Sequence, residues 1–97
     1  MRKQLIVTHT AKSDLRHIYN HIAKDNPQRA KTFVEELAAK IEWIADTDFT
    51  GSPRDYVAED LRMLLYHQRC IYYRSTPDQI IILRVLHSSQ DVAQVKF

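Results

Sequence analysis

The chain has 97 residues, of which 44% are hydrophobic and 27% charged, with a formal net charge of +2 at pH 7. These proportions are typical of one folded domain, residues 1–97, and exclude a disordered tail or a second core. The mild positive charge permits an acidic partner or a nucleic acid and requires neither. A single cysteine, Cys70, excludes a disulfide framework and favours a reducing, cytoplasmic location. No signal peptide or membrane span is expected, because every apolar run is too short.

The first half of the chain predicts one strand followed by two helices. Residues 5–7 form a short β-branched run, and Thr8 or Thr10 can cap the helix that follows. The stretch "KDNPQ" then breaks the chain, with Asn26 as a second N-cap and Pro27 in the first helical turn. A break this short predicts an antiparallel helical hairpin. The two apolar stripes at helical spacing are Ala11, Leu15, Ile18 and Ile22, and Ala30, Phe33, Val34, Leu37, Ala38, Ile41 and Ile44.

The second half predicts a loop and three strands. The segment "DTDFTGSPRD" holds the only glycine, Gly51, and predicts a long loop. The segments "LRMLLYH", "RCIYYRS" and "IIILRVLH" are short and rich in β-branched or aromatic residues, which indicates an antiparallel meander. The predicted fold class is therefore α+β, with an N-terminal strand and a helical hairpin packed on a small antiparallel sheet in the order β-α-α-β-β-β.

The last predicted strand is apolar on both faces. Strict alternation groups Ile81, Leu83, Val85 and His87 on one face, and Ile80, Ile82, Arg84 and Leu86 on the other. Two helices can cover only one face of the sheet. We therefore expect the other face to be covered by the C-terminal tail, by a partner chain, or by both.

Basic side chains gather on or beside the three strands: Arg62, Arg69, Arg74, Arg84, His67 and His87. A metal-free ribonuclease needs a base, an acid and cations at the phosphorane, so His87 with Arg62 and Arg84 is one hypothesis. The competing interpretation is structural: the arginines pair with Asp55, Glu59, Asp60 or Asp91, or lie at strand rims with solvated heads. Arginine in a sheet is more often paired than catalytic, which favours the second interpretation.

Other chemical signals are weak. His17 and His21 lie at i and i+4 with Asp14 nearby, but structural zinc usually has four ligands, so no metal site is predicted. Tyr66, Tyr72 and Tyr73 can stack on bases, although tyrosine is also a standard strand residue. One glycine cannot build a phosphate-binding loop, so no nucleotide cofactor or other small-molecule substrate is expected.

The segments "TAKSDLRHIYNHIAKDNPQRAKTFVEEL", "DLRMLLYHQRCIYYRS" and "IIILRVLHSSQD" together resemble the RelE/ParE superfamily of type II toxin–antitoxin toxins. The resemblance extends from Ile6 to Asp91. Its specific parts are Asp14-Leu15-x-x-Ile18, Asn26-Pro27 with Ala30 and Phe33, Arg62, and Arg84-Val85-Leu86-His87. It implies the same β-α-α-β-β-β fold.

The resemblance implies one of two activities. RelE-like members are ribosome-dependent mRNA endonucleases, whereas ParE-like members lack that catalytic set and inhibit DNA gyrase by binding it. The ending "RVLHSSQD" is similar to ParE, and no tyrosine follows His87. We therefore expect a ParE-like gyrase inhibitor without catalytic residues, neutralised by a ParD-like antitoxin. Alternatives are a nuclease using Arg62, Arg84 and His87, or a non-toxic antitoxin-binding protein. The candidate partner-binding residues are Arg62, Arg74, Arg84, His87 and Tyr73.

Overall fold

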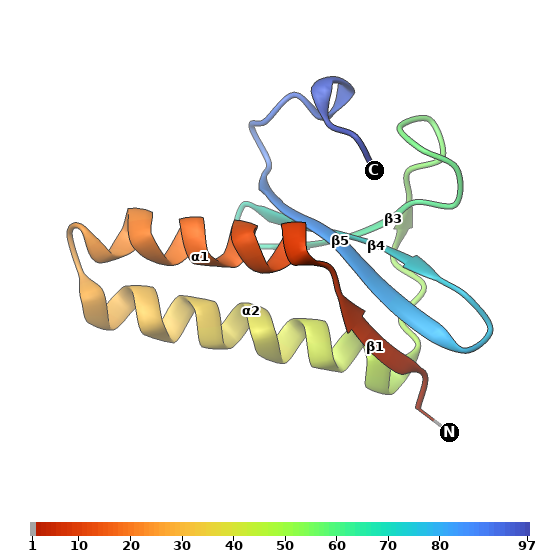
Figure 1. Cartoon of the computed structure of the whole chain (residues 1–97), viewed down its shortest axis with the longest axis horizontal. Coiled ribbons are helices and arrows are strands. Elements are labelled where there is room, and N and C mark those ends of the chain that lie inside the picture. The colour runs from red at the N-terminus through yellow and green to blue at the C-terminus, as the bar shows by residue number, and fades with distance from the viewer. Residues whose placement is uncertain (1) are drawn as a thin grey trace.

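A computed structural model describes residues 2–97 and arranges them as two helices on one face of a five-stranded sheet (Figure 1). The elements in chain order are β1 (Gln4–Val7), α1 (His9–Ala23), α2 (Pro27–Thr47), β2 (Ser52–Pro53), β3 (Arg62–Tyr66), β4 (Arg69–Ser75), β5 (Gln79–His87) and a short 3-10 turn η1 (Val92–Gln94). The predicted α+β class and element order are confirmed. The two-residue strand β2 lies inside the predicted loop.

Both helices begin at capping residues that the sequence indicates. The Thr8 hydroxyl accepts a hydrogen bond from the Ala11 amide at 3.1 Å, so Thr8 rather than Thr10 caps α1. The Asn26 side chain accepts from the Arg29 amide at 3.0 Å, and Pro27 follows as the first residue of α2. The helices are antiparallel neighbours (Figure 1). Their predicted stripes supply most of the buried helical residues, although Ala38 is exposed.

The sheet is mixed rather than purely antiparallel. Its strand order is β1-β5-β4-β3-β2, and β1 runs parallel to β5 with Gln4 opposite Gln79. The other neighbouring strands are antiparallel. The main core lies between this sheet and the helices, where Leu37, Ile44, Ile71, Tyr73 and Ile82 are fully buried.

The predicted division of β5 into two faces is wrong beyond Ile82. Tyr72 pairs with Arg84 but Tyr73 pairs with Ile82, so one extra residue of β5 interrupts the register. Past this irregularity the alternation shifts by one position. Val85 joins Ile80 and Ile82 in the core beneath the helices, while Leu86 faces the opposite side.

The second face of the sheet is covered in large part by the chain itself, although Leu65, which pairs with Cys70 of that face, is 60% exposed. Leu61, Cys70, Tyr72 and Leu86 form a second buried cluster. The residues packed against it come largely from the segment before β3 and from the C-terminal tail: Val57, Ala58, Met63, Leu83, Val92, Val95 and Phe97. In Figure 1 both segments lie on the side of the sheet opposite the helices. Of the expected covers, the tail is thus observed. Burial also raises the pKa of the Cys70 thiol, which disfavours a reactive thiolate.

The turn between β3 and β4 is strained. His67 and Gln68 have φ angles of 44° and 67°, the left-handed pair that a two-residue hairpin requires and that glycine or asparagine usually supplies. A side chain in this region costs on the order of 1–2 kcal/mol. We expect Gln68→Gly to raise the free energy of unfolding by about 1 kcal/mol in urea titrations. The exposed Gln28→Gly in α2 should instead lower it, since glycine destabilises helices. A Gln68→Gly protein no more stable than the parent would contradict the strain.

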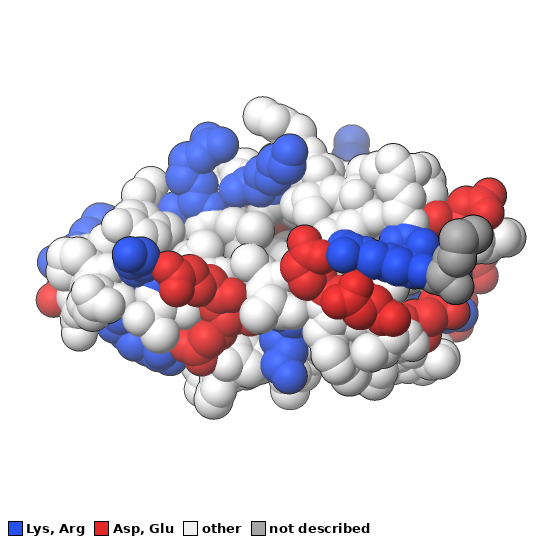
Figure 2. Space-filling model, turned by 90° about the horizontal axis from the view of Figure 1, so that it is seen from below, with Lys and Arg blue, Asp and Glu red and all other residues white. Residues whose placement is uncertain are grey.

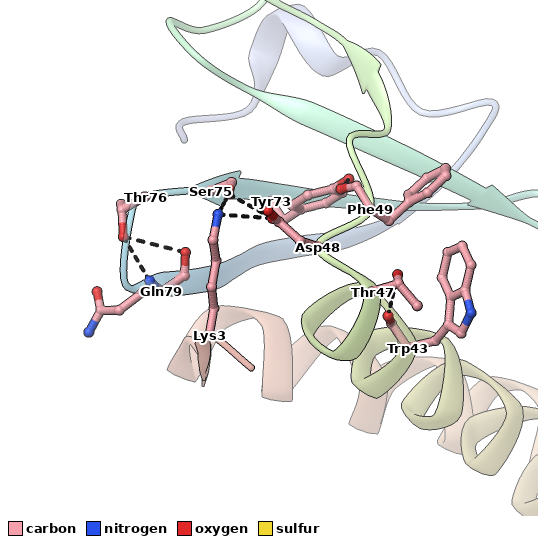
Figure 3. Close-up of polar contacts among 9 residues, drawn as sticks. All are labelled: Lys3, Trp43, Thr47, Asp48, Phe49, Tyr73, Ser75, Thr76 and Gln79. Atoms are coloured by element: carbon pink, nitrogen blue, oxygen red, sulfur yellow. Dashed lines mark hydrogen bonds and ion pairs between the residues drawn. The ribbon is translucent and has the colours of Figure 1, made fainter. Parts of the chain in front are cut away.

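The other end of the sheet is tied together by polar contacts (Figure 3). The Lys3 ammonium lies 2.9 Å from the Asp48 carboxylate, which ends α2 in a left-handed conformation, and donates to the Ser75 hydroxyl at 2.7 Å. Nearby, the Tyr73 hydroxyl donates to the Phe49 carbonyl at 2.7 Å. Gly51 has a φ of 68°, and a Cβ there would overlap this hydroxyl. Tyr73 therefore fixes the chain that leaves α2.

Burial raises the pKa of Tyr73 to about 12, from an ordinary value of 10.0. The neutral hydroxyl is thus favoured in the folded protein, and its contribution to stability is present below pH 10 and lost as pH rises towards 12. Tyr73→Phe should cost about 1 kcal/mol at pH 7 through the lost hydrogen bond. Between pH 10 and 12 the parent should lose about 2 kcal/mol that this variant keeps. Urea titrations across this range measure the difference, and Tyr56→Phe, at an 81% exposed residue, is the control. Parallel curves for the parent and Tyr73→Phe would contradict the assignment.

Candidate partner-binding site

Two adjoining depressions lie where α1 meets the ends of β4 and β5. The first has a volume of about 420 Å³ and is lined by Asp14, His17, Ile18, His21, Arg69, Arg84, Val85, Leu86, His87 and Gln90. The second has a volume of about 430 Å³ and is lined by Ile22, Arg29, Phe33, His67, Gln68, Arg69 and His87. Arg69 and His87 line both, and they face each other as cross-strand neighbours on β4 and β5. We call the two depressions together the basic groove.

Arg84 is held by an ion pair with Asp14. Its Nε and Nη2 atoms donate to the two carboxylate oxygens at 2.8 and 2.9 Å, and the Val85 amide donates to the same carboxylate at 2.9 Å. The hydrogen bond to Asp14 raises the pKa of Arg84. Pairing was expected for these arginines, but with Asp55, Glu59, Asp60 or Asp91. The observed partner lies 70 residues earlier, on α1. Arg84 thus anchors α1 to β5.

His87 is oriented by the turn that follows β5. Its Nδ1 atom accepts a hydrogen bond from the Ser89 amide at 3.1 Å and lies 2.7 Å from the Ser89 hydroxyl. With Nδ1 engaged in this way, the other ring nitrogen is the one left for a ligand.

Arg62 lies away from His87. It stands opposite Tyr73 on β4, whereas His87 stands opposite Arg69, which in turn faces Tyr66. Arg62 is therefore four residues further along β3, a displacement of about 13 Å, and two strands away, about 9–10 Å more. It lines a separate small pocket with Asp55 and Asp60. Arg62, Arg84 and His87 consequently do not form one cluster.

Two other predicted contact residues have structural roles. Tyr73 is fully buried, so its side chain is not available to a partner in this conformation. Arg74 donates from Nε to the Glu59 carbonyl at 3.1 Å and holds the segment before β3. Of the five candidate partner-binding residues, Arg84 and His87 line the basic groove, and Arg62, Arg74 and Tyr73 do not.

Charges at the rim of the groove are partly compensated. Arg29 lies 3.0 Å from the Glu36 carboxylate. Glu36 also accepts a hydrogen bond from the Tyr66 hydroxyl, and this bond is the main cause that lowers the pKa of the carboxyl. Figure 2 views the molecule from below, the side on which α2 lies in Figure 1, and shows acidic and basic side chains interspersed over that face. That face therefore has no continuous basic patch, and the groove is the better candidate for a binding surface.

Sequence reasoning missed the arrangement of the groove. The sequence places Arg69 in the cationic cluster but not among the candidate partner-binding residues, and it suggests His17 and His21 only as weak candidates for metal ligands. Within residues 2–97, no group of three or more histidine, cysteine, aspartate or glutamate side chains is arranged to hold a metal ion. The i, i+4 spacing of His17 and His21 on α1 does place both side chains on one wall of the groove. The facing of Arg69 and His87 required the strand register.

The described residues form a small α+β domain with a basic groove where α1 meets the ends of β4 and β5. A sequence model of the family described as "ParE toxin of type II toxin-antitoxin system, parDE" matches residues 5–92. The chain therefore belongs to the ParE toxin family. Among solved structures, it is similar to a chain of the "Chromosomal ParDE TA system from P. aeruginosa", with a TM-score of 0.77 and 22% identity over 89% of this chain and 96% of that one. A search of curated proteins found no match. No helix within residues 2–97 is long and apolar enough to cross a membrane.

Proposed function

We propose that the chain is a toxin that inhibits DNA gyrase by direct protein–protein contact and is neutralised by a cognate ParD-like antitoxin. Membership of the ParE toxin family supports this proposal. The observation that favours it over the nuclease alternative is the arrangement of Arg62, Arg84 and His87, the three residues that a nuclease would need. Arg84 is bound to Asp14. Arg62 is two strands away from His87 and four residues further along β3 than Tyr66, the residue in line with His87 across the sheet. A phosphorane could not be held by all three in this arrangement.

A supercoiling assay tests the proposal. Purified protein added to gyrase and relaxed plasmid is expected to reduce supercoiling or to accumulate cleaved plasmid. Adding the product of the neighbouring reading frame, expected to be a short protein with an acidic tail, should restore activity. In a parallel translation reaction, mRNA on the ribosome should stay intact.

Three outcomes would contradict parts of the proposal. Cleaved mRNA, with cleavage lost in a folded His87→Ala variant, would establish the endonuclease instead. Unchanged gyrase and intact mRNA, together with harmless expression in the absence of the antitoxin, would indicate a family member that only binds its antitoxin. Inhibition of gyrase that the neighbouring product does not relieve would refute the antitoxin assignment alone.

A further inference from the structure

The outer side of α1 is polar and basic. At about 100° per residue, six residues of α1 and its C-cap fall within about one third of the helix circumference. They are His9, Lys12, Ser13, Arg16, Asn20 and Lys24. All six are exposed or half-buried, whereas Ala11, Asp14 and Ile18 are buried on the opposite side of the helix. We call this set of six the basic face of α1.

The permanent cations of the basic face have no counter-charge within the protein. Within residues 2–97, no carboxylate lies at salt-bridge distance from Lys12, Arg16 or Lys24. The one acidic residue of α1, Asp14, is buried and paired with an arginine of β5. Asp25 follows Lys24 in the chain, but no ion pair joins them. A row of uncompensated cations produces a positive potential that attracts polyanions.

The basic face is accessible over its whole length. In Figure 1 the end of the hairpin at which α1 and α2 are joined projects beyond the sheet. From Lys12 to Lys24 the face extends about 18 Å, at about 1.5 Å per residue. A DNA duplex carries one phosphate for about every 1.7 Å of its axis, so a face of this length reaches several phosphates at once.

The residue types of the basic face distinguish between kinds of partner. A protein interface has apolar or aromatic anchors at its centre, but the only large apolar side chain of α1 that is well exposed is Tyr19, which is 38% exposed. A single strand is held by several aromatic side chains on which successive bases stack, and one tyrosine does not provide this. Lysine, arginine, serine and asparagine are, by contrast, side chains that contact the phosphates of a duplex.

We propose that the basic face of α1 binds the phosphate backbone of duplex DNA without reading its sequence. Lys12, Arg16 and Lys24 neutralise phosphates, and Ser13 and Asn20 donate hydrogen bonds beside them. None of the six residues lines the basic groove, so the two surfaces are separate. The choice of DNA rather than double-stranded RNA rests on the proposed function, because gyrase acts on duplex DNA. The toxin then contacts the enzyme and its DNA together.

Fluorescence anisotropy of a labelled duplex of about 20 base pairs, titrated with the full chain, tests the proposal. The dissociation constant is expected to lie at about 10⁻⁶–10⁻⁴ M, the range of binding through phosphates alone. Three phosphate contacts predict a slope of about −2.7 for log affinity against log salt. The affinity should therefore rise about 40-fold between about 200 and about 50 mM salt.

A pair of double variants locates the binding surface. Lys12→Gln with Arg16→Gln removes two cations and keeps residues that favour a helix. At about 50 mM salt it should bind at least about tenfold more weakly, with a slope near −0.9. Arg54→Gln with Lys96→Gln makes the same change of net charge in the segment before β3 and in the tail, on the side of the sheet opposite the helices (Figure 1). This control should change affinity by less than about twofold and keep the slope.

Amide chemical shifts of the unmodified protein, recorded during a titration with the duplex, give a second measurement that stands even if a variant does not fold. Changes are expected within residues 9–24. Affinity that does not depend on salt, equal loss in the two double variants, or shifts confined to other surfaces would overturn the proposal. Tighter binding of single-stranded DNA, of an RNA duplex or of polyglutamate would overturn it by assigning the face to another partner.

The fate of this site and that of the proposed function can be told apart. A parent protein that leaves gyrase unaffected but binds the duplex with the expected slope would refute the proposed function and support the site. Inhibition of gyrase by a protein that does not bind the duplex would refute the site and leave the proposed function standing.

Discussion

Asp14→Ala is expected to lower the free energy of unfolding by about 3 kcal/mol. The substitution removes the acceptor of two Arg84 hydrogen bonds and of the Val85 amide. It leaves a guanidinium that is only 23% exposed without its carboxylate, and breaking such a pair typically costs more than the pair contributes. Urea unfolding monitored by circular dichroism measures the change.

Two controls define the origin of this loss. Asp14→Asn keeps one acceptor oxygen and should lose about half as much stability. Asp25→Ala removes an exposed carboxylate just beyond α1 and should change stability by less than about 0.5 kcal/mol. A loss below about 1 kcal/mol in Asp14→Ala would mean that the ion pair does not hold α1 on β5.

Ending the chain after Asp91 is expected to destabilise the protein by about 2–4 kcal/mol. The deletion removes Val92, Val95 and Phe97, which are partly buried against the second cluster, and the Phe97 ring lies with its centroid 5.0 Å from that of Tyr72. Partial burial of three apolar side chains contributes about this much. Exposure of Tyr72 and Leu86 should also increase binding of a hydrophobic dye to the native protein.

Single substitutions within the tail locate this effect. Phe97→Ala should account for about 1–2 kcal/mol of it, while Lys96→Ala, at an exposed residue, should be within about 0.5 kcal/mol of the parent. Thermal unfolding and dye fluorescence report both changes. A truncated chain as stable as the parent, with unchanged dye binding, would show that the tail does not protect this face.

Local signals carry the parts of the fold that sequence reasoning predicted. Caps at Thr8 and Asn26 and regular apolar spacing mark the helices, because these features act within one or two turns. No local signal predicts that β1 runs parallel to its neighbour, since that neighbour, β5, lies at the other end of the chain. The irregularity in β5 has no marker either: both faces of that strand are apolar, so a shifted alternation produces the same pattern of residue types.

The candidate site was harder to predict for the same reason. Arg69 meets His87 only because the β4–β5 register shifts by one residue between Tyr72 and Tyr73, and no residue type in either strand marks that shift. Local spacing associates Asp14 with His17 and His21 on α1, whereas its actual partner, Arg84, is 70 residues away in sequence. The tail cover was one of the expected alternatives, but composition alone cannot choose between a chain's own residues and those of a partner.

The parallel pairing of β1 with β5 delays completion of the fold during synthesis. Gln4 reaches its neighbour Gln79 only after 75 further residues have been made. At about 5–20 residues per second, the first strand and the helical hairpin spend several seconds outside the ribosome before the sheet can close. Such long-range closure is also slow for a chain of this size. We therefore expect newly made molecules to become active only after translation ends, which gives a co-produced binding protein an interval in which to meet them.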